Sequence, residues 1–178
     1  MTNDGQRFRK LTAVAPEPMS FNAIVIGPGN GVESLATREL MGESFTTVEF
    51  PVAASSPLVP HLVKQELNSP TCRELFNFYD RDPTVCEWYY QAYGDEHKTS
   101  TSDILNPVAN ILVWPGLPKM VGRVIILKNG PVGGRWNMTL DVDPKALEQT
   151  LWWYHRSGRD IRTVSSERGL IRMSLNQT

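Results

Sequence analysis

The sequence predicts an α+β fold in which an antiparallel sheet of about five strands packs against one helix of the C-terminal half. Residues 121–127 form, apart from Gly122 and Arg123, an apolar run rich in β-branched residues, which is typical of a strand covered on both faces. Residues 136–142 alternate between apolar and polar side chains, which predicts a strand with one solvated face. Residues 128–134 between them contain three glycines, so the two strands are expected to pair as an antiparallel hairpin with a long loop.

The helix after this hairpin has clear start and stop signals. Asp143 is a favourable N-cap residue, Pro144 fits the first helical position, and Gly158 stops the helix. Three residues at helical spacing form its expected core stripe: Leu147, Leu151 and Tyr154.

Trp152 and Trp153 lie on opposite sides of this stripe. One sheet cannot cover both sides well, so we expect one indole to pack in the core and the other to be an interface anchor.

The remaining elements follow from periodicity and turn residues. Strands are predicted at residues 21–26, 45–50 and 108–114, and a final hairpin at 161–164 and 170–175. Helices are predicted at 32–41 and 58–67, and two more start at the capping pairs Ser69-Pro70 and Asp82-Pro83. The helices within about residues 58–93 would form a small helical subdomain beside the sheet. Residues 1–20 are expected to be an N-terminal arm, and residues 21–178 a single domain.

The helix starting at Asp82 carries aromatic residues on every side, more than one buried stripe can hold. Core packing explains part of this set, and Trp88, Tyr90 and Tyr93 are candidate interface anchors.

The net charge of −1 conceals an asymmetry along the chain. Residues 1–118 hold 8 Lys+Arg against 14 Asp+Glu, and residues 119–178 hold 10 against 5. This pattern fits head-to-tail association or an anionic partner, and a mixed solvated surface is the alternative. The arginines that gather at the end of the chain, candidates for contact with RNA, nucleoprotein or an anionic membrane, are Arg156, Arg159, Arg162, Arg168 and Arg172.

A glycine-rich turn, Gly27-Pro28-Gly29-Asn30-Gly31, follows the first strand and precedes a predicted helix. It resembles the first glycine-rich motif of class I S-adenosylmethionine methyltransferases, as Asn106-Pro107 weakly resembles their Asn-Pro catalytic turn. The resemblance implies a doubly wound sheet, with S-adenosylmethionine bound at Gly27, Gly29 and Gly31 and its ribose hydroxyls at Glu49.

No other motif indicates catalysis or metal binding. His61, His97 and His155 are far apart, and none has a partner at the spacing of a metal pair. Cys72 and Cys86 also lack metal-ligand spacing and are expected to be reduced core residues. We therefore expect no catalytic residue, no metal and no cofactor.

From these surfaces the sequence predicts a non-enzymatic structural subunit that self-associates into a larger particle, like a viral matrix, coat or tail protein. Its expected partners are copies of itself and an anionic nucleic acid, nucleoprotein or membrane surface. Its expected location is intracellular (cytoplasmic) or inside a virus particle, because no secretion signal or transmembrane run is visible. The alternative is a small S-adenosylmethionine-binding methyltransferase-like enzyme that uses the glycine turn.

Overall fold

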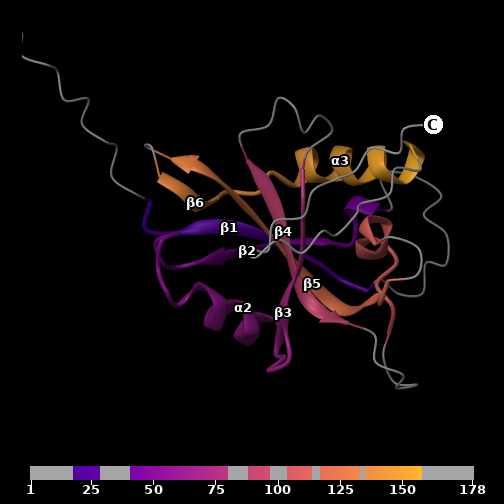
Figure 1. Cartoon of the computed structure of the whole chain (residues 1–178), viewed down its shortest axis with the longest axis horizontal. Coiled ribbons are helices and arrows are strands. Elements are labelled where there is room, and N and C mark those ends of the chain that lie inside the picture. Colours follow the sequence, from indigo (N-terminus) through magenta and orange to yellow (C-terminus); the bar gives the residue numbers. More distant parts are fainter. Residues whose placement is uncertain are drawn as a thin grey trace, which may run out of the picture.

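The computed structural model describes residues 18–28, 41–79, 88–96, 104–113, 117–132 and 135–157. This part of the chain forms one six-stranded antiparallel sheet with helices on both faces, so the predicted α+β fold is confirmed (Figure 1). Its strands are β1 (Phe21–Ile26), β2 (Phe45–Phe50), β3 (Arg73–Phe78), β4 (Tyr89–Glu96), β5 (Met120–Val132) and β6 (Arg135–Leu140). Its helices are α2 (Val59–Leu67), the short 3₁₀ helix η1 (Ala109–Leu112) and α3 (Pro144–Ser157).

β5 is the strand around which the sheet is built. Residues 120–129 of β5 pair with β4 along one edge. Along the other edge, residues 124–126 pair with β1 and residues 128–132 pair with β6. The strand order β2-β1-β5-β4-β3 places β2 and β3 at its two ends, and β6, which pairs with β5 alone, also has an open edge in the described part of the chain. The predicted central position of residues 121–127 is therefore confirmed.

Side chains on the two faces of the sheet form two separate cores. We call these the α3 face and the α2 face, after the helix that packs on each (Figure 1). The sheet residues buried on the α3 face include Ile24, Ile26, Phe78, Tyr90, Val124 and Ile126. Those buried on the α2 face include Phe21, Val25, Phe50, Ile125 and Leu127.

The start of α3 follows the predicted capping signal. The Asp143 carboxylate accepts a hydrogen bond from the Lys145 amide at 3.0 Å, which satisfies a donor that has no partner within the helix. The predicted core residues Leu147, Leu151 and Tyr154 are buried on the α3 face. The strand predictions for residues 21–26 and 45–50 and the helix prediction for residues 58–67 are also confirmed.

The helix predicted to start at Ser69 is wrong, because β3 begins at Arg73, and so is the helical subdomain of residues 58–93. The start of the helix predicted at Asp82 lies outside the described residues, and its expected continuation from Tyr89 is the strand β4. After α2, the described residues of this segment contain the strand β3 and the first part of β4. In β4, Tyr90 and Ala92 enter the core of the α3 face, and Gln91 lies between them on the other face. This alternation over two residues is the strand period, and pairing with β5 selects it over the helical one.

The strand predicted at residues 108–114 is also wrong, because this segment contains η1. The Asn106 side-chain oxygen accepts a hydrogen bond from the Ala109 amide at 3.0 Å and so caps the start of this helical turn. The loop predicted at residues 128–134 is shorter than expected, since β5 continues to Val132 and β6 begins at Arg135.

Several predictions fall outside the described residues: most of the helix at 32–41, the hairpin at 161–175, and residues 1–17 of the N-terminal arm. Among the helices that the structure does describe, none has both the length and the apolar character needed to cross a lipid bilayer.

Candidate functional site

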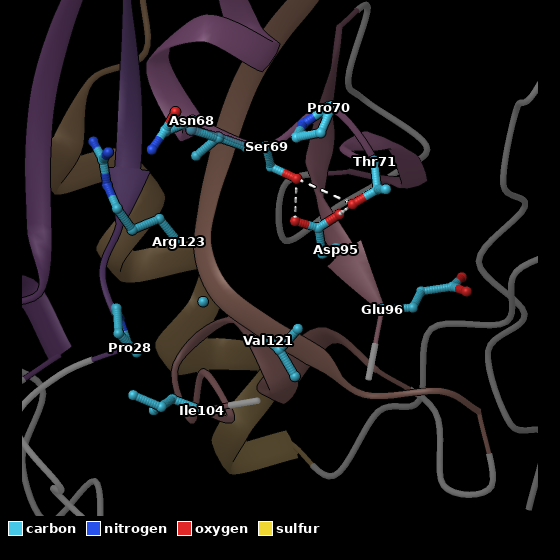
Figure 2. Close-up of a pocket in the computed structure, with 12 residues that line it drawn as sticks. Pro28, Asn68, Ser69, Pro70, Thr71, Asp95, Glu96, Ile104, Val121 and Arg123 are labelled. Atoms are coloured by element: carbon cyan, nitrogen blue, oxygen red, sulfur yellow. Dashed lines mark hydrogen bonds between the residues drawn. The ribbon is translucent and has the colours of Figure 1, made fainter. Parts of the chain in front are cut away.

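A hollow with a volume of about 600 Å³ opens beside the start of β5 (Figure 2). Its walls come from segments that are distant in sequence. These are Pro28, which follows β1, the turn between α2 and β3, the end of β4 and the start of β5. The lining residues are Pro28, Leu67, Asn68, Ser69, Pro70, Thr71, Asp95, Glu96, Ile104, Val121, Gly122 and Arg123.

A bulge in β5 shapes the floor of the hollow. Tyr93 pairs with Ile125 and Asp95 pairs with Val121. Residues 122–124 of β5 therefore lie opposite Gly94 alone. Within the bulge, Gly122 has a φ of 63°, a conformation that costs other residues roughly 1–2 kcal/mol. A Cβ atom placed on Gly122 would meet nothing within 4 Å, so the backbone is open to the hollow here. Such bulges commonly redirect side chains beside functional sites.

One wall of the hollow holds Asp95 in a fixed position. Ser69 Oγ donates a hydrogen bond to Asp95 Oδ2 at 2.6 Å, and Thr71 Oγ1 donates one to Asp95 Oδ1 at 2.7 Å (Figure 2). The two hydroxyls reach β4 because α2 ends at Asn68, whose left-handed φ of 51° turns the chain back toward the sheet. The carboxylate is therefore oriented by two neutral donors.

Arg123 stands on the opposite side of the hollow (Figure 2). Its Nη2 atom is 2.7 Å from Glu66 Oε1, and its Nη1 atom donates to the Glu66 carbonyl oxygen at 2.8 Å. These contacts attach the C-terminal end of α2 to β5. They also pair the Arg123 charge with a carboxylate.

An exposed isoleucine lines the lower part of the hollow. The side chain of Ile104 is 65% exposed, which is high for a large apolar residue. Its backbone is nevertheless held in place, because the Gly122 amide donates a hydrogen bond to the Ile104 carbonyl at 2.8 Å and Leu105 forms a β-bridge with Val121. Ile104 therefore presents a fixed apolar surface to the hollow.

The described lining of the hollow carries carboxylates, hydroxyls and one guanidinium group. No histidine is among the described residues that line it, and this part of the chain contains no group of three His, Cys, Asp or Glu side chains that could hold a metal ion. Burial, with a smaller contribution from Asp95, raises the pKa of the nearby Cys72 thiol to about 11. A thiol with this pKa is protonated at neutral pH and is a poor nucleophile.

The structure describes only the first two residues of the predicted glycine turn. Pro28 lines the hollow, whereas Gly29 and Gly31 lie outside the described residues. Glu49 is exposed on β2 and pairs with Asn22 of β1. The pairing of β1 with both of its neighbours is antiparallel, which differs from the doubly wound sheet that the methyltransferase resemblance implied.

Asn106 of the Asn-Pro pair has a structural role. Its Nδ2 group donates hydrogen bonds to the carbonyl oxygens of Ile26, at 3.0 Å, and Gly122, at 2.8 Å, while its oxygen caps η1. The side chain is fully buried, and it joins β1 and β5 beside the hollow.

The candidate interface residues of β4 do not form one patch. Tyr90 is 1% exposed in the core of the α3 face, and the half-buried Trp88 contacts it edge-on at 5.0 Å between ring centroids. Tyr93 packs on the α2 face instead and donates a hydrogen bond to Glu74 at 3.5 Å.

On α3, Trp152 and Trp153 are both half-buried against the core of the α3 face. Arg156 is exposed at the end of this helix. Arg159, Arg162, Arg168 and Arg172 lie outside the described residues.

A row of polar side chains crosses the α2 face, and sequence reasoning did not find it. Asn129 donates a hydrogen bond to the Gln91 side chain and accepts one from Thr139. Beyond Gln91, burial raises the pKa of the Glu74 carboxyl, and hydrogen bonds from Asn77, Tyr93 and Gln91 partly offset this rise. The residues of this row come from four strands, so strand pairing had to be known before they could be grouped.

β2 and β3, the strands at the two ends of the order, differ in how readily their free edges could pair with another chain. β3 is interrupted by a bulge between Glu74 and Phe76, and Arg73 forms an ion pair with Glu96 at 2.7 Å. β2 pairs with β1 without interruption over its whole length and contains no lysine or proline. Bulges, prolines and charged side chains, lysine above all, protect an outer strand from pairing with another chain, and of these β2 has only the carboxylate of Glu49.

The hydrogen-bonding pattern shows which groups of β2 face outward. The Gly27 amide donates to the Ser44 carbonyl at 3.0 Å, which continues the β1–β2 register by one pair. Hydrogen-bonded pairs alternate along an antiparallel ladder, so the next β2 residues bonded to β1 are Thr46, Val48 and Phe50. The residues whose amides and carbonyls point away from β1 are Phe45, Thr47 and Glu49.

No protein-family model matches the chain, and no curated protein or solved structure matches it significantly.

Proposed function

We propose that this protein is a non-enzymatic structural subunit that self-associates, and that one of its contacts is the antiparallel pairing of β2 with β2 of a second copy. The observation that carries the proposal is the regular, unprotected outer edge of β2, which is paired with no other strand besides β1 in the described part of the chain. Such an edge is a template for strand addition.

One register satisfies the outward groups of both strands. With a twofold axis through Thr47, Thr47 faces its own copy, and Phe45 faces Glu49 of the second copy. All three outward-facing residues then pair, giving about six hydrogen bonds. A shift that brings Glu49 opposite itself would place like charges together, which is unfavourable. The twofold register through Thr47 is therefore the one we propose.

The expected strength follows from typical magnitudes. Six hydrogen bonds at a net 0.5–1.5 kcal/mol each contribute roughly 3–9 kcal/mol. Association costs about 4–15 kcal/mol in lost translational and rotational freedom. Edge pairing therefore needs additional side-chain burial, and the half-buried Phe45 and Val48 can supply it. A weak, concentration-dependent dimer is expected from this contact alone.

A larger particle requires a second kind of contact, since a twofold pairing closes on itself. The half-buried tryptophans of α3 are our candidates for it, on the opposite side of the sheet from α2 (Figure 1). The basic C-terminal residues beginning at Arg156 are proposed to face an anionic partner, either nucleic acid, nucleoprotein or membrane.

Cysteine trapping tests the pairing and its register. In a background with Cys86 replaced by serine, Thr47→Cys is expected to give a disulfide-linked dimer under mild oxidation, because directly opposite residues have Cα atoms about 5.5 Å apart. Thr46→Cys is the matched control. It changes the neighbouring exposed threonine, which in this register faces Val48 and lies too far from its own copy to be bridged.

Thr47→Pro provides a second measurement. It removes an outward amide hydrogen without removing a bond to β1, so it should lower the average mass in sedimentation equilibrium while the protein stays folded. The proposal is wrong if the wild-type protein is monomeric at all concentrations tested, or if the two cysteine variants cross-link equally.

A further inference from the structure

The hollow beside β5 contains one carboxylate whose charge is not balanced by the ion pairs around it. Arg123 is paired with Glu66, and Glu96 is paired with Arg73. Asp95 is held by the hydroxyls of Ser69 and Thr71, and within the described residues no ion pair includes it. The charged groups at this site therefore leave a net negative charge at Asp95.

The Asp95 carboxylate has room for a further donor. Its two oxygens offer about four acceptor positions, and the two hydroxyls occupy one on each oxygen. The hydroxyls also fix the orientation of the carboxylate, so a ligand would not have to order it. A positively charged donor is the group that best matches this position, because hydrogen bonds between two charged partners are the strong ones.

The rest of the hollow is suited to an apolar group. Gly122 leaves its backbone uncovered in the lining. Ile104 and Pro28 lie on the side of the hollow away from Asp95 (Figure 2). A ligand with its charged end at Asp95 would lay its other end over Gly122 toward Ile104. The volume of about 600 Å³ is within the range of small-molecule sites.

From this arrangement we propose that the hollow binds a small organic cation, a primary ammonium group carried on an alkyl or aryl chain. The ammonium donates to Asp95, and the chain covers Ile104. This site is separate from the β2 edge, so it goes beyond the proposed function.

Binding of phenethylammonium, measured by two-dimensional NMR titration, is the direct test. The experiment uses Thr47→Pro protein, so that a failure of self-association does not affect the result. Phenethylammonium should shift the amide signals of residues around Gly122, whereas phenethyl alcohol, which has the same ring and no charge, should bind at least about tenfold more weakly.

Two variants and one control locate the site. Asp95→Asn keeps an acceptor for the hydroxyls and removes the charge, and it should reduce affinity at least about tenfold. Ile104→Ala should weaken the binding of phenethylammonium more than that of methylammonium. A general loss of structure would not produce this difference. Glu43→Gln, which removes an exposed carboxylate that does not line the hollow, should leave affinity within about twofold of wild type.

The proposal is overturned if phenethylammonium causes no saturable shift, if the alcohol binds as tightly, or if Asp95→Asn and Glu43→Gln have equal effects. Each of these outcomes leaves the cysteine-trapping result for β2 unaffected.

Discussion

Asn106 and Ile26 are 80 residues apart in sequence, and the Asn106 side chain donates a hydrogen bond to the Ile26 carbonyl at 3.0 Å. The same amide group also bonds Gly122, and its oxygen caps η1. One buried side chain thus satisfies three backbone groups, and its bonds to the Ile26 carbonyl and the Ala109 amide are buried from water.

Replacing this asparagine should therefore be costly. Asn106→Ala leaves buried carbonyl and amide groups without partners, at about 1–3 kcal/mol for each group that water cannot reach, so we expect a loss of about 2–4 kcal/mol in the free energy of unfolding. Urea denaturation followed by fluorescence measures it. Thr46→Ala, at an exposed position, is the control. A change of less than about 0.5 kcal/mol for Asn106→Ala would show that the network contributes little.

Gly130 lies directly against Trp88, and this contact predicts an overpacking effect. A Cβ atom on Gly130 would be 2.6 Å from the Trp88 Cβ atom and 3.3 Å from its Cα atom, so backbone would have to move. Gly130→Ala should destabilise the protein by about 1–3 kcal/mol in thermal or urea unfolding. Gly94→Ala is a matched control, since its Cβ would approach a Val124 methyl group at 3.2 Å and should cost less. Equal effects of the two substitutions would contradict this account.

The raised pKa of Glu74 predicts a pH-dependent stability. Burial raises the folded-state pKa above the ordinary value of 4.5, so the folded protein binds more protons than the unfolded chain between 4.5 and the raised pKa. Stability should fall as pH rises through this window and should not change further, on account of this group, above it. Glu74→Gln removes the titration, so the stability difference between variant and wild type should grow in favour of the variant over the same window. Urea midpoints measured from pH 4 to 8 test this, and a constant difference would refute it.

The surroundings of the two tryptophans of α3 indicate which one is the better candidate for the proposed interface anchor. Trp153 contacts the buried Tyr154 edge-on at 4.8 Å, whereas Trp152 lies against the exposed His155 and Arg156. Trp153→Ala should therefore lower the free energy of unfolding by about 2–4 kcal/mol. Trp152→Ala should change it by less than about 1 kcal/mol and should reduce the mass measured at high concentration. Equal destabilisation by both substitutions, with no change in mass, would mean that neither indole is an anchor.

Local signals in the sequence were sufficient where one element could form without help from distant residues. The start of α3 depends on the Asp143 side chain and a proline beside it, and both act within one turn. The same pattern at Ser69-Pro70 was misleading. There Ser69 bonds Asp95 across the sheet instead of capping a helix, and the aromatic residues that follow are strand formers once β4 pairs with β5.

The hollow could not be predicted from the sequence for a related reason. Ser69, Asp95 and Arg123 carry no spacing that groups them, and they come together through a β-bulge and the end of α2. The alternation of polar and apolar side chains in β2 was predictable, because the strand at residues 45–50 was recognised. Its position at the edge of the sheet depends on pairings that only the folded chain shows.

The pairing of Ile24 with Ile126 also has a consequence during synthesis on the ribosome. The apolar strand β1 leaves the exit tunnel long before the central strand that covers one of its edges has been translated. At typical rates of 5–20 residues per second, this delay is about 5–20 seconds. For that time β1 has β2 as a neighbour and an incomplete sheet to join, which is the condition in which nascent chains aggregate or recruit chaperones. Slower translation between the two strands should therefore increase the dependence of this protein on chaperones without changing its final stability.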